Sequence, residues 1–337
     1  MEGSGYESLV TTGAAIPAGK FAKGADVSWL TEMEAAGRKF YTAQGVEADL
    51  FEILKGYGIN AIRLRVWVNP AGGWNGLADV LAKAQRVKQA GMDLMLDFHY
   101  SDNWADPGKQ YKPAAWSNHS VAQLYKDVYQ HTFEICAALK EAGFYPKWVQ
   151  VGNETDNGLL WEEGRFPEHM DQYAQFINHG YQGVKDVFPD SLVIVHVSNG
   201  YNNTLFRWNI GGLIKHGTQF DVIGMSLYPS TYKPAAHWSV YCEQCLNNMK
   251  DMVSRFHKPV MLCEVGMEYT MADACKAFLM DMIKKVNSLP KGYGLGVFYW
   301  EPEGYNWGED DYKMGAWETD GRPTKAMEAF LYDQSQD

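Results

Sequence analysis

Short apolar runs alternate with amphipathic stretches along the chain, and the alternation repeats through eight units. The apolar runs are rich in Val, Ile and Leu and have the length of strands, whereas the stretches between them carry apolar residues at helical spacing. We predict strands at 24–29, 60–67, 92–98, 148–151, 191–197, 220–226, 260–263 and 294–299. We predict helices near 47–57, 77–90, 120–142, 167–187, 205–215, 240–256, 272–287 and 324–332.

This order of elements predicts a single α/β domain. Near-continuous apolar strands indicate a parallel sheet that is buried on both faces. Eight strand–helix units without a break in composition predict one closed (β/α)8 TIM barrel over residues 21–334, preceded by a flexible segment at 1–20. A doubly wound open sheet is the alternative, but no Gly-x-Gly-x-x-Gly follows the first predicted strand.

Long polar segments at 100–118, 155–166 and 301–321 follow the third, fourth and eighth predicted strands. In a (β/α)8 barrel, the segments that follow the strands meet at the C-terminal face, where active sites are built. We therefore expect the active site at that face.

Composition narrows the classes of partner. The 337-residue chain has a net charge of −11, which argues against nucleic acid and anionic membrane surfaces because both require basic patches. No run of about 20 apolar residues is present, so no membrane span is predicted. Aromatic residues form 14% of the chain, and many lie in polar segments, which suggests rings exposed at strand ends. Core filling is the alternative for any single Trp.

The N-terminal region and the cysteines give weaker indications. Residues 1–24 lack the basic and long apolar regions of an intact signal peptide. The 5 cysteines form no dense framework. Cys242 and Cys245 are spaced like metal ligands, but no second Cys or His pair completes a zinc site. A local disulfide and two free thiols are both compatible with this spacing.

Two glutamates mark the ends of the fourth and seventh predicted strands. Glu154 ends the run Trp-Val-Gln-Val-Gly-Asn-Glu, and Glu264 ends Pro-Val-Met-Leu-Cys-Glu. These strand ends face each other across the mouth of a barrel, and two carboxyl groups about 5–5.5 Å apart are what a retaining glycosidase requires. Asp97 and Glu301 are other strand-end carboxylates. From the pattern alone, a salt-bridged structural role for either glutamate is an equal alternative.

Several motifs resemble those of clan A glycoside hydrolases. Val-Gly-Asn-Glu on the fourth strand together with a glutamate on the seventh is typical of the clan. The motifs Arg-Val-Trp-Val-Asn-Pro at 65–70, Leu-Asp-Phe-His-Tyr-Ser-Asp-Asn-Trp at 96–104, Ile-Gly-Met-Ser-Leu-Tyr-Pro at 223–229 and Phe-Tyr-Trp-Glu-Pro at 298–302 are similar to those of family 53, the endo-β-1,4-galactanases. The resemblance extends over residues 20–334.

The resemblance implies a retaining endo-β-1,4-galactanase that cleaves the galactan of type I arabinogalactan, in the side chains of pectin. Glu154 would be the general acid/base and Glu264 the nucleophile. The negative charge of Glu264 would raise the pKa of Glu154 until the nucleophile is glycosylated. Arg63 would keep Glu264 ionised, whereas Arg65 is expected to point outward. A mannanase-like enzyme and a catalytically silent galactan-binding protein are the alternatives.

The resemblance also implies the residues that surround the sugar. His99, Asn153 and Tyr228 match polar positions around the −1 sugar, and Tyr228 is expected to donate a hydrogen bond to Glu264. Trp300 would form the floor of that subsite. Three further tryptophans are candidates for extending this floor: Trp104, which we favour, and Trp67 and Trp116, for which scaffold packing is an equal alternative. For Asp102 and Asp106 we favour a role in shaping the third loop.

We expect neither a cofactor nor a metal. The segment 265–272 lacks the ligand cluster of the calcium site that some family members carry after the seventh strand, and the acidic run 309–311 is expected to be a solvated loop. The expected partner is galactan or a galacto-oligosaccharide, with the protein a monomer. By analogy we expect an extracytoplasmic location, whether secreted, periplasmic or at the cell surface, without a signal segment in this chain.

Overall fold

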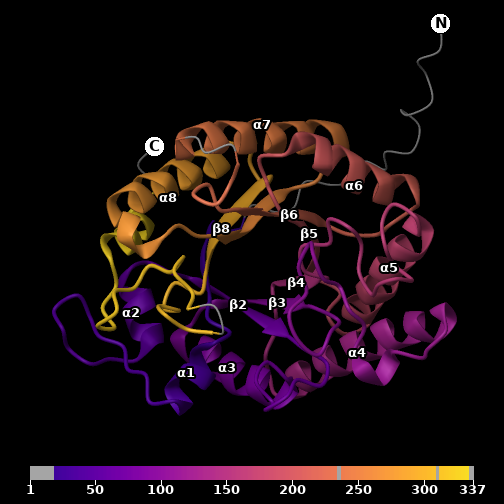
Figure 1. Cartoon of the computed structure of the whole chain (residues 1–337), viewed down its shortest axis with the longest axis horizontal. Helices are drawn as coiled ribbons and strands as arrows, with labels where there is room; N and C mark the ends of the chain where they lie inside the picture. The colour runs from indigo at the N-terminus through magenta and orange to yellow at the C-terminus, as the bar shows by residue number, and fades with distance from the viewer. Residues whose placement is uncertain (1–18, 234–236, 309–310, 334–337) are drawn as a thin grey trace, which may run out of the picture.

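A computed structural model describes residues 19–233, 237–308 and 311–333. Its eight strands form a closed barrel in which every neighbouring pair is parallel and follows the order of the sequence, and β8 pairs with β1. The single (β/α)8 barrel predicted from the sequence is therefore confirmed (Figure 1). The strands are β1 (Ala22–Asp26), β2 (Ala61–Val66), β3 (Asp93–Phe98), β4 (Trp148–Val151), β5 (Leu192–Val197), β6 (Val222–Leu227), β7 (Val260–Val265) and β8 (Gly294–Trp300).

The helices form a ring around the barrel (Figure 1). They are α1 (Leu30–Ala35), α2 (Leu50–Gly56), α3 (Leu77–Ala90), α4 (Val121–Glu141), α5 (Met170–Val187), α6 (Asn203–Lys215), α7 (Trp238–Phe256) and α8 (Ala272–Asn287), with 3-10 segments η1 (Ala114–Trp116), η2 (Tyr269–Met271) and η3 (Lys325–Leu331). Within the described part of the chain, no helix combines the length and apolar character needed to cross a membrane.

Capping residues explain where several helices begin and end. α4 begins with a capping box in which Ser120 and Gln123 satisfy each other's backbone N–H groups. α3 ends at Gly91, whose φ of 70° is the left-handed conformation that glycine adopts without strain. The sequence did not predict α1, which is only 6 residues long. The predicted last helix is instead the 3-10 segment η3. The predicted flexible segment at 1–20 lies largely outside the described residues.

The barrel interior consists of an apolar layer below a polar layer. Side chains alternate between the two faces of each strand, and the lower inward positions hold Ala22, Ala61, Met95, Trp148, Ile194, Val222, Met261, Cys263 and Phe298. The buried inward positions nearer the carboxyl ends are polar: Asp26, Arg63, Asp97, Gln150, His196 and Ser226. The apolar layer closes the bottom of the barrel, so the polar layer faces only the C-terminal mouth.

A register shift brings Glu264 into this polar layer. The pairing of β6 with β7 moves from Met225–Leu262 to Ser226–Glu264, which leaves Cys263 without an opposed residue. In a regular strand Cys263 and Glu264 would point to opposite faces. The irregularity allows both side chains to face the barrel interior, as β-bulges commonly do beside active sites.

Candidate active site

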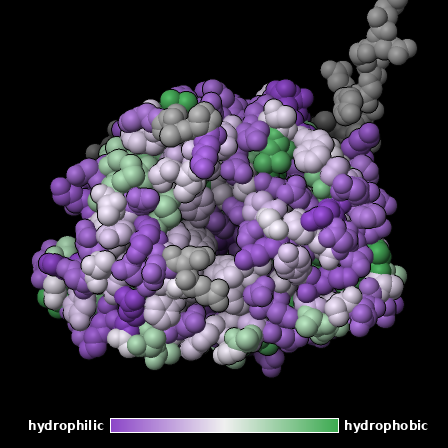
Figure 2. All heavy atoms as spheres, in the orientation of Figure 1, coloured by the Kyte–Doolittle hydropathy of each residue, from purple (hydrophilic) through white to green (hydrophobic). Residues whose placement is uncertain are grey.

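A cavity of about 1090 Å³ opens at the carboxyl ends of the strands. Figure 2 shows the corresponding hollow near the middle of the face that Figure 1 presents. It is lined by segments that follow seven of the strands, all except β7, and by both predicted catalytic glutamates. The residues used below that line it are Trp29, Trp67, His99, Trp104, Asp106, Asn153, Glu154, Ser226, Tyr228, Glu264, Trp300 and Tyr312.

Glu154 and Glu264 lie close together at the base of this cavity. One carboxylate oxygen of each, together with a ring nitrogen of His196, falls within a set of atoms that are all within 4.8 Å of one another. Glu264 is only 6% exposed, whereas Glu154 is partly exposed to the cavity. Two carboxyl groups at this distance interact strongly, because like charges in a buried site cannot both ionise at ordinary pH.

Glu264 is held by a cation and a phenol. Arg63 Nη2 donates to one carboxylate oxygen at 2.9 Å, and Tyr228 Oη donates to the other at 2.8 Å. Burial raises the pKa of Glu264 above its usual value, and the Arg63 charge and the Tyr228 hydrogen bond oppose that rise. These contacts favour the ionised carboxylate and fix its orientation.

Glu154 has a different environment. Burial raises its pKa well above the usual value, and the negative charges of Glu264 and Asp156 raise it further. The hydroxyl of Ser226 donates to its Oε1 at 2.7 Å and opposes this shift. Gly152 and Glu154 both have positive φ, 89° and 45°, so the chain turns sharply after β4 and presents the carboxyl group to the cavity. A left-handed conformation is unusual for glutamate and is common in functional loops.

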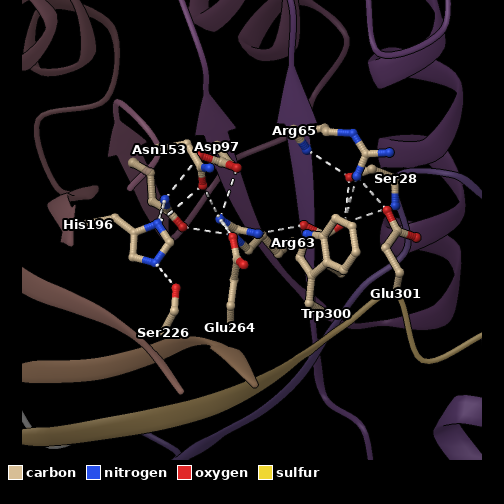
Figure 3. A network of polar contacts seen from close by, with 12 residues as sticks. Ser28, Arg63, Arg65, Asp97, Asn153, His196, Ser226, Glu264, Trp300 and Glu301 are labelled. Carbon is tan, nitrogen blue, oxygen red and sulfur yellow. Dashed lines mark hydrogen bonds and ion pairs between the residues drawn. The ribbon is translucent and has the colours of Figure 1, made fainter. Parts of the chain in front are cut away.

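Arg63 is the centre of the polar layer (Figure 3). Besides Glu264, its guanidinium contacts Asp26 at 2.8 Å and Asp97 at 2.9 Å. Its Nε donates to Gln150 Oε1 at 2.7 Å. Because Arg63 and its partners are buried, a guanidinium that is always charged balances carboxylates that would otherwise be unpaired.

His99 and Asn153 reach the cavity wall, but other protein groups already hold their polar atoms. His99 Nε2 lies 3.0 Å from Asp97, and its Nδ1 accepts from Trp67 Nε1 at 3.2 Å. Asn153 Oδ1 accepts from Arg63 at 2.9 Å, and its Nδ2 donates to the Ala105 carbonyl at 2.8 Å. These contacts lock both side chains in place.

Aromatic rings form the cavity wall around Trp300. The Trp300 ring lies 5.0 Å from Trp29, 5.9 Å from Trp104 and 4.9 Å from Tyr312, centroid to centroid. Trp67 joins the group through Trp104 at 5.2 Å. All these rings except that of Trp29 are partly exposed, so they can offer flat apolar faces to a ligand.

The expectation that Arg65 points outward is wrong. Positions 63 and 65 are two apart and therefore share the inward face of β2. Arg65 is buried, pairs with Glu301 at 2.5 Å, and its guanidinium lies 4.3 Å from the centroid of the Trp104 ring. It thus supports the aromatic wall from below by a cation–π contact.

The remaining candidate residues have different outcomes. Asp102 accepts from the backbone N–H groups of Asn69 and Ala114, which fits the loop-shaping role. Asp106 Oδ1 accepts a hydrogen bond from the Gly108 backbone N–H at 2.8 Å, and Asp106 also lines the cavity. Trp116 is buried and packs in the core cluster between the strands and helices. Glu309 and Asp310 of the acidic run lie outside the described residues.

Glu154, His196 and Glu264 are also spaced as metal ligands could be. The same groups are engaged within the protein, however: Arg63 occupies Glu264, and Ser226 lies between His196 and Glu154. The guanidinium of Arg63 provides positive charge where a cation would bind, so this donor set fits an acid–base pair better than a metal. Cys242 and Cys245 are buried free thiols, so the structure favours two free thiols over a local disulfide for this pair.

Besides Asp26, three residues of the polar layer that lie within apolar strands were missed from the sequence: Gln150, His196 and Ser226. Each is a single polar residue inside an apolar strand, in Trp-Val-Gln-Val, Val-His-Val and Met-Ser-Leu. A polar residue that interrupts a buried strand needs a hydrogen-bonding partner. That signal was available, and it indicates the inward polar layer once the barrel is recognised.

Comparison with known proteins identifies the family. The model of Glycosyl hydrolase family 53 matches residues 22–334. A probable arabinogalactan endo-beta-1,4-galactanase A of Aspergillus fumigatus is 32% identical over 302 residues, covering 83% of each chain. An arabinogalactan endo-beta-1,4-galactanase of Thermothelomyces thermophilus is 32% identical over 83% of this chain and 89% of its own. A solved fungal beta-1,4-galactanase has a TM-score of 0.85 at 29% identity, covering 92% of this chain and 98% of that one. The resemblance predicted from the motifs is confirmed, and the chain belongs to glycosyl hydrolase family 53.

Proposed function

We propose that this family 53 glycoside hydrolase is a retaining endo-β-1,4-galactanase, with Glu264 as nucleophile and Glu154 as general acid/base. The observation that carries the proposal is the placement of the two carboxylates, whose oxygens approach within 4.8 Å at the base of an open cavity. Inverting enzymes hold their carboxyl groups about 6.5–9.5 Å apart to admit a water, whereas retaining enzymes hold them about 5–5.5 Å apart. The galactanase relatives support galactan as the substrate.

In the first step, the ionised Glu264 attacks the anomeric carbon while Glu154 gives its proton to the departing glycosidic oxygen. The contacts from Arg63 and Tyr228 keep Glu264 ionised and aimed. The charge of Glu264 helps to keep Glu154 protonated. A glycosyl ester on Glu264 and a free chain end are the products of this step.

In the second step, Glu154 takes a proton from water, which attacks the same carbon and releases Glu264. The ester carries no charge, so the part of the rise in the pKa of Glu154 that the Glu264 charge causes is lost, and the carboxylate of Glu154 becomes available as a base. Two inversions at one carbon give net retention. The aromatic wall around Trp300 provides apolar faces on which the C–H groups of a pyranose can pack.

Substrate class is tested by comparing hydrolysis of β-1,4-galactan, β-1,4-mannan and cellulose. We expect galactan to be cleaved at internal bonds, with little release from the other two. Strong mannan hydrolysis without galactan hydrolysis would refute the proposal and favour the mannanase-like alternative.

The role of Glu264 is tested by Glu264→Ala. We expect hydrolysis to fall by roughly 10⁴-fold or more, because the nucleophile is lost, while galactan binding persists. Ser191→Ala is the control: Ser191 is buried at the opposite end of the barrel, where its hydroxyl donates to the Pro146 carbonyl, so activity should be unchanged. Unchanged turnover in Glu264→Ala would contradict the assignment.

We also propose, by analogy with enzymes that degrade external polysaccharides, that the enzyme acts outside the cytoplasm. As a working state we propose a monomer, since one chain supplies all the residues of the site described above.

A further inference from the structure

A continuous path of hydrogen bonds joins the two glutamates through the polar layer. It runs from Glu264 to Arg63, then through Gln150, His196 and Ser226 to Glu154. We propose that Ser226, His196 and Gln150 are positioning residues that decide which oxygen of Glu154 carries the catalytic proton. The inference rests on the proposed function, because it takes Glu154 to be the general acid/base.

Arg63 fixes the donor and acceptor roles along the path, because its guanidinium can only donate hydrogen bonds. Its Nε donates to Gln150 Oε1 at 2.7 Å, so the other end of that amide is the NH₂ group. This NH₂ group lies 3.0 Å from Asp97 Oδ1, an acceptor, and 3.0 Å from His196 Nδ1. The orientation of the Gln150 amide is therefore fixed, and it presents a donor to the histidine.

His196 Nδ1 must then accept. Besides the Gln150 amide, the backbone N–H of Glu154 also points at Nδ1, at 3.4 Å, and a backbone N–H has no acceptor form. The ring is neutral, because burial and the nearby Arg63 charge lower its pKa well below the usual value. A neutral imidazole that accepts at Nδ1 carries its hydrogen on Nε2. That hydrogen is donated to Ser226 Oγ at 2.8 Å.

The opposite tautomer fits less well. Its Nδ1–H would face the two donors just described and would have only Asn153 Oδ1, at 3.2 Å, as acceptor. That oxygen already accepts a charge-assisted hydrogen bond from Arg63 at 2.9 Å. Two donors and one shared acceptor therefore favour the tautomer with hydrogen on Nε2.

Ser226 completes the path. Since its oxygen accepts from His196, its single hydrogen is free to be donated to Glu154 Oε1, 2.7 Å away. Oε1 is thereby held as an acceptor in both protonation states of Glu154, and the acid's proton is left to Oε2. When Glu154 later acts as base, Oε2 takes the proton of the attacking water. One carboxyl oxygen thus serves both chemical steps without rotation of the side chain.

The titratable and charged groups that face Glu154 come from several elements. They are Arg63 on β2, Asp156 beyond β4, His196 on β5, Tyr228 and Tyr232 beyond β6, and Glu264 on β7. Among the strongest influences on Glu154, the Ser226 hydroxyl and the Arg63 charge favour the ionised form. Loss of that hydroxyl therefore raises the pKa of Glu154 in the free enzyme.

The test is the pH dependence of galactan hydrolysis by Ser226→Ala, with Ser191→Ala as the buried serine control. We expect kcat to fall about tenfold, less than the roughly 10²–10⁴-fold contribution of a general acid. The basic limb of the kcat/KM profile should move to higher pH, which a merely structural defect would not cause. Ser226→Thr, which keeps the hydroxyl, should restore the wild-type limb. If Ser226→Ala does not fold, Ser226→Cys, whose thiol is a weak donor, carries the same expectation.

A wild-type pH profile and kcat in folded Ser226→Ala would overturn the positioning role. Glu154→Gln, measured in parallel, separates this failure from failure of the proposed function. If Glu154→Gln is inactive while Ser226→Ala is unaltered, Glu154 remains the acid/base and only the path is wrong. If Glu154→Gln retains full activity, the proposed function itself is wrong.

Discussion

At the scale of single residues, the site separates two chemically identical glutamates by what surrounds them. Glu264 contacts a permanent cation, Arg63, and a phenol donor. Glu154 faces two carboxylates, Glu264 and Asp156, and receives one hydroxyl hydrogen bond. The first environment favours the charged form and the second favours the protonated form. Different roles for the two carboxyl groups follow from these contacts.

Asp156 offers a test of these electrostatics through stability. Burial raises its pKa from 3.8 to about 6, although Ser198 donates to both of its oxygens. The folded state therefore binds this proton more tightly than the unfolded state. The resulting stability is present in full below about pH 4 and is lost as the pH rises through about 6, a loss of about 3 kcal/mol.

We expect Asp156→Asn to remove this loss. The free energy of unfolding of the variant, relative to the wild type, should rise by about 2 kcal/mol between pH 4 and pH 7, as measured by denaturant titration, because the rest of the loss falls near and below pH 4. The variant also removes a negative charge near Glu154, so the basic limb of kcat/KM should move to lower pH. A difference in stability that does not change with pH would show that Asp156 is ionised throughout this range.

Motifs identified residues at the mouth of the barrel better than residues beneath it. Glu154, Glu264, Tyr228 and Trp300 follow or end strands and could be named from local patterns. The positioning residues beneath them are separated in sequence and meet only because eight strands close on one another. The sequence did contain the information needed to place Arg65, because residues two apart in a strand share one face, and Arg65 therefore faces inward with Arg63.

At the scale of elements, small departures from regular geometry aim the two glutamates. The register shift between β6 and β7 turns Glu264 inward, and the left-handed turn after β4 presents Glu154. Neither feature is visible in a pattern of apolar residues, which records where a strand lies and not how its register changes. Long helices such as α3 and α8 were predicted with their observed bounds because their spacing and terminal residues agree.

Gly152→Ala tests the turn that carries Glu154. At φ 89° the added methyl group is strained, and it would lie 2.6 Å from Thr155 Cγ2, so the turn must shift. We expect the free energy of unfolding to fall by about 1–2 kcal/mol. We also expect kcat to fall by about tenfold or more, because displacement of an acid/base group by a fraction of an ångström is costly.

Gly91→Ala is the matched control for this strain. Gly91 has φ 70°, an added methyl group there meets no atom within 4 Å, and the residue precedes β3 at the opposite end of the barrel. The Gly91→Ala variant should lose about as much stability as Gly152→Ala, and its kcat should be unchanged. Equal effects of the two substitutions on kcat would show that the turn does not position Glu154.

At the scale of the whole molecule, the residues that form the core and the residues that form the site occupy different parts of the barrel. The apolar layer and the helices form the core, while the polar layer and the aromatic wall meet at one face. Fold class could be predicted from the sequence because eight repeated units leave few alternatives. The shape of the cavity could not be predicted, since it depends on seven loops that meet at one face of the barrel.

The central claim is double displacement on β-1,4-galactan by Glu154 and Glu264, and the anomeric form of the first product tests it most directly. Proton NMR spectra recorded within the first turnovers of galactan hydrolysis distinguish new β reducing ends from α ends before mutarotation mixes them. We predict β-anomeric signals first, followed by slow appearance of the α form. New reducing ends that are α from the start would contradict the account.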